Sequence, residues 1–172
     1  MNKRLLYKKA YRILHNSTPL KLDCGVLCNK ACCKGDEETG MYLFPGEEVM
    51  YEAVPQLLSI KQTTQRYGSN VPVKLAVCRG DCNRMLRPLA CRIFPLTPYI
   101  SSEGTLSVKT DVRAKALCPI AIHSNTEDIN PFFVRNVYKV FRLLIDDKNV
   151  KEFIEYLSNL QDEYSPFFDS NP

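Results

Sequence analysis

Eight cysteines in 172 residues constrain this chain more than any other feature of its sequence. Four of them lie between residues 24 and 33, and the other four lie between residues 78 and 118. The full set is Cys24, Cys28, Cys32, Cys33, Cys78, Cys82, Cys91 and Cys118. A cluster this dense indicates a disulfide framework, a metal site or a redox centre, and the cellular compartment decides between them.

The first 15 residues begin with basic side chains and carry charges throughout, so they lack the apolar stretch of a signal peptide. No later stretch approaches the roughly 18 apolar residues of a membrane span. We therefore expect a cytoplasmic protein with no membrane partner. Thiols stay reduced in that compartment, which favours metal ligation over disulfides.

The formal net charge of +4 is weak support for a nucleic-acid partner. Eight thiolates add eight negative charges and two zinc ions add four positive ones, which brings the formal charge to zero. Two cubane iron–sulfur clusters give the same result. A nucleic-acid binder that uses a basic N-terminal helix with Tyr7 and Tyr11 is therefore the weaker alternative.

Seven of the basic residues that lie among the cysteines are candidate partners of the thiols. They either lower the pKa of the thiols and offset their negative charge, or are ordinary solvated side chains. These residues are Lys30, Lys34, Arg79, Arg84, Arg87, Arg92 and Lys115.

Apolar spacing predicts an α+β fold in one domain, residues 1–172, with a metal-binding part at 22–120 and a helical cover at 130–164. A helix is predicted over 3–15, with Leu6, Ala10, Ile13 and Leu14 on one stripe. The cover consists of two antiparallel helices, one starting at Pro131 and the other near Val150, separated by Asp146 and Asp147.

The middle of the chain carries shorter predicted elements. A helix starts at Pro45, with Glu47 and Glu48 in its first turn and with Val49, Ala53, Leu57 and Leu58 facing the core, until Pro55 kinks or ends it. Residues 61–70 are expected to form a polar loop. A strand over 71–77 leads to Cys78, and Pro72 places that strand at a sheet edge. A short helix over 83–94 precedes a hairpin formed by 96–100 and 105–109.

Cysteine spacing limits the kinds of site. The close pairs Cys24/Cys28, Cys28/Cys32 and Cys78/Cys82 have three intervening residues, so the Cys-x2-Cys of zinc knuckles is absent. Pairs at i and i+4 lie on one face of a helical turn, which permits shared ligation. A radical-SAM cluster would need cysteine where Ala31 stands. Adjacent Cys32 and Cys33 diverge in most conformations, which favours a binuclear site or two sites; a strained vicinal disulfide is the alternative.

Residues 22–120 resemble the YkgJ-like cysteine-cluster family, also called CxxCxxCC proteins. The resemblance is carried by the clustered cysteines, by Cys78-x3-Cys82 and above all by the Arg-Pro-x-x-Cys-Arg-x-Phe-Pro stretch at 87–95. It implies a zinc- or iron-chelating domain whose eight cysteines are the ligands. The spacing before the Cys-Cys pair departs from the family pattern, which leaves the metal and the ligand grouping open.

The leading hypothesis is a metal-binding protein that holds two zinc ions or an iron–sulfur centre. The alternative is a metal-dependent protein-modifying enzyme resembling flagellin lysine N-methylases, which carry a similar cysteine cluster. No glycine-rich SAM loop supports this alternative, so it rests on analogy. We assign no catalytic residue. His15 is interpreted as a helix-end residue, His123 as a spare ligand, and a protein partner is left open.

Arg87 and Arg92 have three interpretations: they stabilise the thiolates, bind a substrate anion, or pair with core carboxylates.

Overall fold

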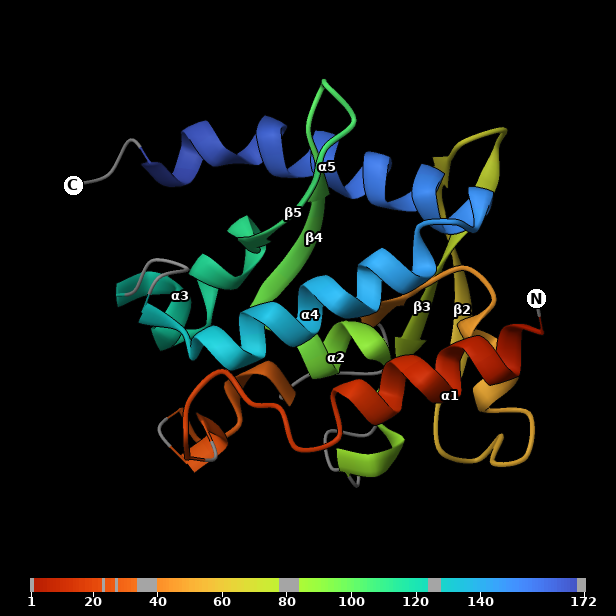
Figure 1. Cartoon of the computed structure of the whole chain (residues 1–172), viewed down its shortest axis with the longest axis horizontal. Coiled ribbons are helices and arrows are strands. Elements are labelled where there is room, and N and C mark those ends of the chain that lie inside the picture. Colours follow the sequence, from red (N-terminus) through yellow and green to blue (C-terminus); the bar gives the residue numbers. More distant parts are fainter. Residues whose placement is uncertain are drawn as a thin grey trace.

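Five α-helices and two small antiparallel sheets form the part of the chain that the computed structural model describes (Figure 1). The described residues are 2–22, 24–26, 28–33, 40–77, 84–123 and 128–169. The fold is mixed α+β, as predicted. One continuous buried core contains residues from the first helix to the last, as a single small domain requires. No helix among the described residues is long and apolar enough to cross a membrane.

Helix α1 (Lys3–Ile13) begins at Asn2, whose side chain accepts a hydrogen bond from the backbone N–H of Leu5. Its predicted apolar stripe is confirmed in the main, because Leu6, Ala10 and Leu14 are buried. The helix ends at Ile13, two residues earlier than predicted.

The three-stranded sheet has the order β1-β3-β2, with β1 at Met41–Leu43, β2 at Ser59–Tyr67 and β3 at Val71–Val77. The predicted polar loop at 61–70 is wrong, since most of it is strand β2. Nearly all side chains of β2 are exposed, so the strand lacks the alternation of apolar and polar residues that marks a half-buried strand. Backbone pairing with β3 holds it in place.

Strand β3 is confirmed, but its predicted edge position is wrong, because it lies at the centre of the sheet. Proline is tolerated in this central strand because β1 pairs with only part of β3. Strand β1 pairs only with residues 74–76 of β3. Pro72 lies outside that pairing and has only β2 beside it, so it occupies a position that is locally an edge.

Two predicted helices are much shorter than expected, and proline explains both. After Pro45 only Glu47–Met50 forms a 3₁₀ turn, and Ala53 is exposed rather than buried. Pro55 lacks a backbone donor and disfavours helical geometry in the residue before it, which leaves too few residues for a helix. The helix predicted over 83–94 is split by Pro88.

The 3₁₀ turn Arg84–Leu86 precedes Pro88, and helix α2 (Leu89–Ile93) follows it with Pro88 as the N-cap residue. The predicted hairpin is confirmed, with β4 at Leu96–Ile100 and β5 at Leu106–Thr110. Gly104 closes its turn at φ +79°, a conformation that favours glycine. A 3₁₀ turn at Val112–Ala116 then leads to the short helix α3 (Pro119–His123).

Helices α4 (Pro131–Leu144) and α5 (Lys148–Asp169) are confirmed, including the break between them. Asp147 accepts hydrogen bonds from the backbone N–H groups of Asn149 and Val150, which starts α5. The two helices run in opposite directions (Figure 1), and the β4–β5 hairpin packs against both of them.

The core contains aromatic rings that pack at an angle to one another. The ring of Phe44 lies 5.0 Å from that of Phe141 and 5.5 Å from that of Phe153, measured between centroids. All three residues are almost fully buried.

Candidate metal centre

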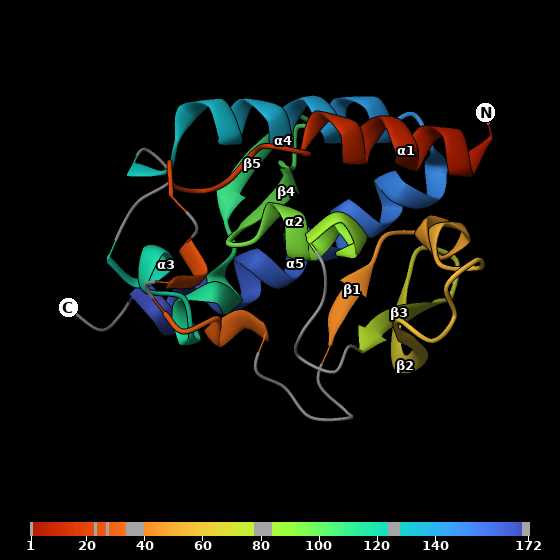
Figure 2. The same ribbon diagram turned by 90° about the horizontal axis from the view of Figure 1, so that it is seen from below.

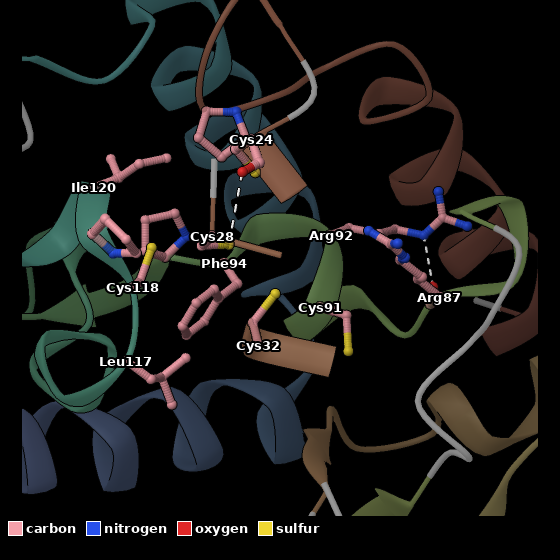
Figure 3. Close-up of a pocket in the computed structure, with 13 residues that line it drawn as sticks. Cys24, Cys28, Cys32, Arg87, Cys91, Arg92, Phe94, Leu117, Cys118 and Ile120 are labelled. Carbon is pink, nitrogen blue, oxygen red and sulfur yellow. Dashed lines mark hydrogen bonds between the residues drawn. The ribbon is translucent and has the colours of Figure 1, made fainter. Parts of the chain in front are cut away.

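Five of the six described cysteines line one pocket (Figure 3). They come from three segments that are distant in sequence, namely the turns at 24–33, helix α2 and the residue before α3. The five are Cys24, Cys28, Cys32, Cys91 and Cys118. Figure 2 shows the turns at 24–33 beside α3, at one end of the molecule. The fold therefore brings together thiols that the sequence separates by as many as 94 residues, from Cys24 to Cys118.

The segment from 24 to 33 is wound tightly enough for three of its thiols to reach the same pocket. Two 3₁₀ turns, Cys24–Val26 and Ala31–Cys33, enclose Asn29 and Lys30, which adopt φ of 48° and 55°. The backbone N–H of Lys30 donates to the carbonyl oxygen of Gly25 at 2.9 Å. Cys28 and Cys32 therefore do not lie on one continuous helical turn, because the left-handed residues Asn29 and Lys30 separate them. Cys24, Cys28 and Cys32 nevertheless line the same pocket.

The hydrogen bond of Cys28 and the pKa of Cys32 show how closely the thiols of this segment lie. The Sγ of Cys28 donates to the carbonyl oxygen of Cys24 at 3.7 Å. The pKa of the Cys32 thiol is raised, first by a hydrogen bond with Cys33, then by burial and by the charges of Cys33, Cys28 and Cys24. These thiols are thus close enough to disfavour one another's ionisation in the absence of a cation.

The vicinal pair does not form a disulfide, since both Cys32 and Cys33 are free thiols in this structure. Cys32 lines the pocket, whereas Cys33 is not among the described residues that line it.

Arg92 fixes the segment that carries Cys91. Its guanidinium donates from Nε to the carbonyl oxygen of Arg87 at 2.7 Å and from Nη2 to that of Met85 at 2.5 Å. The guanidinium carbon also lies 4.0 Å from the ring centroid of Tyr11 on α1. Arg92 is one of the residues that line the cysteine pocket, and in Figure 3 its guanidinium extends towards α1. Arg92 therefore joins α2 to α1 and to the turn before it.

Glu47 is a buried partner of this arrangement that the sequence prediction missed. The prediction placed it in the first turn of a helix for its favourable interaction with the helix dipole, but it is 0% exposed. Its carboxylate accepts hydrogen bonds from Tyr11 Oη at 2.6 Å, from the N–H of Leu89 at 2.6 Å and from the N–H of Phe44 at 3.1 Å. Burial raises the pKa of Glu47 to about 7, although these hydrogen bonds and the charge of Arg92 oppose the rise. Nothing in the sequence around Glu47 indicates that its side chain is buried.

Several predicted site residues lie outside the described part of the chain. They are Cys78, Cys82, Lys34 and Arg79, together with the side chains of Arg84 and His123. His15 is exposed just after α1. Within the ranges that the structure describes, no three His, Cys, Asp or Glu side chains are arranged to hold an ion as they stand. The pocket thus brings predicted ligands together, but its geometry does not show which of them would bind the same ion.

A larger cleft adjoins the cysteine pocket. It has a volume of about 490 Å³ and lies between one face of the three-stranded sheet and the layer formed by α2, β4 and α5. Phe94 and Leu117 line both cavities. The polar side of the cleft holds the ion pair of Arg113 with Asp111, in which Nε donates to Oδ1 at 2.8 Å. The guanidinium carbon of Arg113 lies 4.8 Å from the ring centroid of Tyr42.

Comparison with known proteins identifies no relative: no protein-family model, curated protein or solved structure matches this chain.

Proposed function

We propose that this protein binds metal through its clustered cysteines, holding zinc or an iron–sulfur centre in a reducing compartment such as the cytoplasm. The observation that carries the proposal is the convergence of five free thiols from three segments on one pocket. Thiolates are soft donors, and zinc and iron–sulfur clusters are the centres that such a donor set favours. The donor chemistry of the pocket therefore fits the group that the sequence resemblance implies.

The ligands would come first from the pocket itself, namely Cys24, Cys28, Cys32, Cys91 and Cys118. Cys33 is adjacent to Cys32 and hydrogen-bonded with it. Cys78 and Cys82 are proposed on sequence spacing and on the resemblance to YkgJ-like proteins alone. Eight thiolates would suffice for two four-coordinate zinc ions.

Metal binding would also stabilise the fold locally. The segments at 24–33, 91 and 118 contain short 3₁₀ turns and five-residue helices, which have little stability of their own. A shared ion would close the long loops between them, so metal affinity and local folding would be coupled.

The decisive experiment is purification without oxygen, followed by metal and sulfide analysis. A brown protein with iron and sulfide identifies an iron–sulfur centre, and a colourless protein with two zinc ions per chain identifies zinc sites. Eight thiols that react freely in native protein, before any chelator is added, would contradict the proposal.

Cys91→Ser tests the pocket as the site. The variant should lower the metal stoichiometry, because α2 then lacks its ligand. Ala90→Ser on the same short helix is the matched control, since it adds a hydroxyl without removing a thiol and should keep full metal content. Full metal content in Cys91→Ser would show that Cys91 is only a packed side chain.

A second candidate function is supported by the adjoining cleft. Its volume of about 490 Å³ falls within the range of small-molecule sites, and it shares two wall residues with the cysteine pocket. This arrangement suits the metal-dependent modifying enzyme that the resemblance to flagellin lysine N-methylases suggests.

Calorimetric titration with S-adenosylmethionine, together with a methyl-transfer assay on a lysine peptide, tests this second function. Leu75→Trp should fill the cleft from β3 and abolish binding while leaving the metal content unchanged. Absence of both binding and transfer in the metal-loaded wild type would refute it.

A further inference from the structure

Helices α1 and α4 together contain many cations and no acidic residue. Neither Lys3–Ile13 nor Pro131–Leu144 includes an aspartate or a glutamate. Six of their basic residues are exposed and form no ion pair with any residue that the structure describes. These six are Lys8, Lys9, Arg12, Arg135, Lys139 and Arg142. We call them the basic face.

The fold places the two helices side by side and antiparallel. Lys3 at the start of α1 forms an ion pair with Asp147, which follows α4. After the other end of α1, Ser17 accepts a hydrogen bond from Asn136 Nδ2 at 3.2 Å, and the carbonyl oxygen of Pro19 accepts one from the N–H of Asn130. The helices are therefore joined at both ends, and Figure 2 shows them side by side along one edge of the molecule.

The cations of both helices lie opposite their buried sides. On α4, Arg135, Lys139 and Arg142 follow helical spacing i, i+4, i+7, which extends over about 10 Å at 1.5 Å per residue. Val137 and Phe141 on the inner side of α4 are fully buried, as are Leu6 and Ala10 on α1. Neighbouring helix axes lie about 8–10 Å apart. The result is a broad positive surface rather than scattered charges.

We propose that the basic face binds the phosphate backbone of a nucleic acid. Six cations without acidic neighbours on their own helices complement a regular array of phosphates. Tyr138 is 40% exposed among the cations of α4 and offers a ring on which a base can stack. Contact with phosphates and a single ring makes the binding independent of sequence.

An anionic membrane is the less favoured occupant. A helix that lies in a bilayer surface inserts an apolar face, and the apolar faces of α1 and α4 are already buried in the core.

Net charge obscured this surface in the sequence, because a formal +4 says nothing about where the cations lie. Tyr7 and Tyr11, the rings that the sequence offered for stacking, are not available. Tyr7 is fully buried, and the hydroxyl of Tyr11 is hydrogen-bonded to Glu47 and Tyr51. The surface that the structure assigns instead depends on α4, which lies more than 100 residues away in sequence.

The test is fluorescence anisotropy with a labelled single-stranded oligonucleotide of about 20 nucleotides, titrated with metal-loaded full-length protein over a range of salt concentrations. The wild type should bind, with log K falling linearly against log salt at a slope of about −0.7 per phosphate contact. The triple variant R135Q/K139Q/R142Q should weaken binding at 0.1 M salt by on the order of 100-fold and reduce the slope by about 2.

The control variant K61Q/R66Q/K151Q removes the same charge from exposed positions on β2 and α5 and should bind like the wild type. The charge-conserving R135K/K139R/R142K should also keep its affinity. An equal loss of oligonucleotide affinity in R135Q/K139Q/R142Q and in K61Q/R66Q/K151Q would show that net charge alone drives binding. That result would overturn the proposal. Tight binding to vesicles with phosphatidylserine, in the absence of oligonucleotide binding, would likewise overturn it.

Discussion

Glu47 should make the stability of this protein fall as pH rises, opposite to the usual effect of a carboxylate in an ion pair. Burial raises the pKa of its side chain from the ordinary 4.5 to about 7 in the folded protein. The folded state therefore binds the proton more tightly than the unfolded state. The resulting stabilisation is complete below pH 4.5 and is lost as pH rises through about 7.

The magnitude follows from the size of the pKa change. One pKa unit corresponds to about 1.36 kcal/mol, so Glu47 should lower the free energy of unfolding by about 3 kcal/mol between about pH 4.5 and pH 8. Complete burial of the carboxylate supports applying this conversion without a reduction for solvent screening.

The assay is urea unfolding of the wild type and of Glu47→Gln at intervals from pH 5 to pH 8. The metal content is matched, so that the pH dependence of metal binding cancels in the difference between the two proteins. The amide that replaces the carboxyl group in this variant cannot ionise, and the stability advantage of the wild type should therefore shrink by about 2–3 kcal/mol over this range. Glu48→Gln is the control, because Glu48 is partly exposed and pairs with Lys74. A constant difference from pH 5 to pH 8 would refute the reasoning.

Four further tests concern the core and the candidate site. Phe153→Ala should lower the free energy of unfolding by about 3–5 kcal/mol in urea, because its buried ring contacts four other aromatic rings; a loss below about 1 kcal/mol would contradict this packing. Gly40→Ala should cost about 1–3 kcal/mol by the same assay, since its Cβ would lie 2.5 Å from the carbonyl oxygen of Ala76. Arg92→Ala should speed amide exchange at residues 84–87 and metal loss to a chelator, and unchanged exchange would argue against its anchoring role. Chelation should loosen residues 22–120 more than 130–164, which hydrogen exchange would show.

Elements with a strong local signal were predictable from the sequence. Helices α4 and α5 each combine a regular apolar stripe with a capping side chain, which is Asn130 for α4 and Asp147 for α5. The hairpin around Gly104 has a strand on each side of a polar turn. In each of these the local preference of the residues and the demands of the core agree, which is the condition under which local patterns determine structure.

The errors arose where non-local contacts decide the structure. Strand β2 is polar on both faces, and only its pairing with β3 makes it a strand. Pro72 suggested an edge, but the position of β3 depends on how far the short β1 extends. Glu47 resembles any acidic residue that follows Pro-Gly in a sequence. It is buried because α1 and α2 pack against it, and its sequence neighbours do not indicate that packing.

The sequence predicts thiolate ligation from its eight cysteines together with the expected reducing compartment, and this stays a prediction. It does not predict how the cysteines are arranged in space. That Cys24, Cys91 and Cys118 face one pocket follows from the packing of three segments against the core. The neighbouring cleft and the basic face could not be predicted without the packing of distant segments either, because each is formed by elements that are far apart in sequence.

The Arg-Pro-x-x-Cys-Arg-x-Phe-Pro stretch at 87–95 can be understood as one physical unit. Pro88 starts α2 and Cys91 lines the pocket. Arg92, the next residue, also lines the pocket, and its guanidinium lies over the ring of Tyr11. A helix of five residues cannot hold its own orientation in water, so its anchors must do so. Arg92 binds the preceding turn, and Glu47 accepts the first N–H of α2 at Leu89. The position of the Cys91 thiol therefore depends on two buried ionisable residues, Arg92 and Glu47, that need not contact metal. Their loss should weaken the retention of metal without removing a ligand.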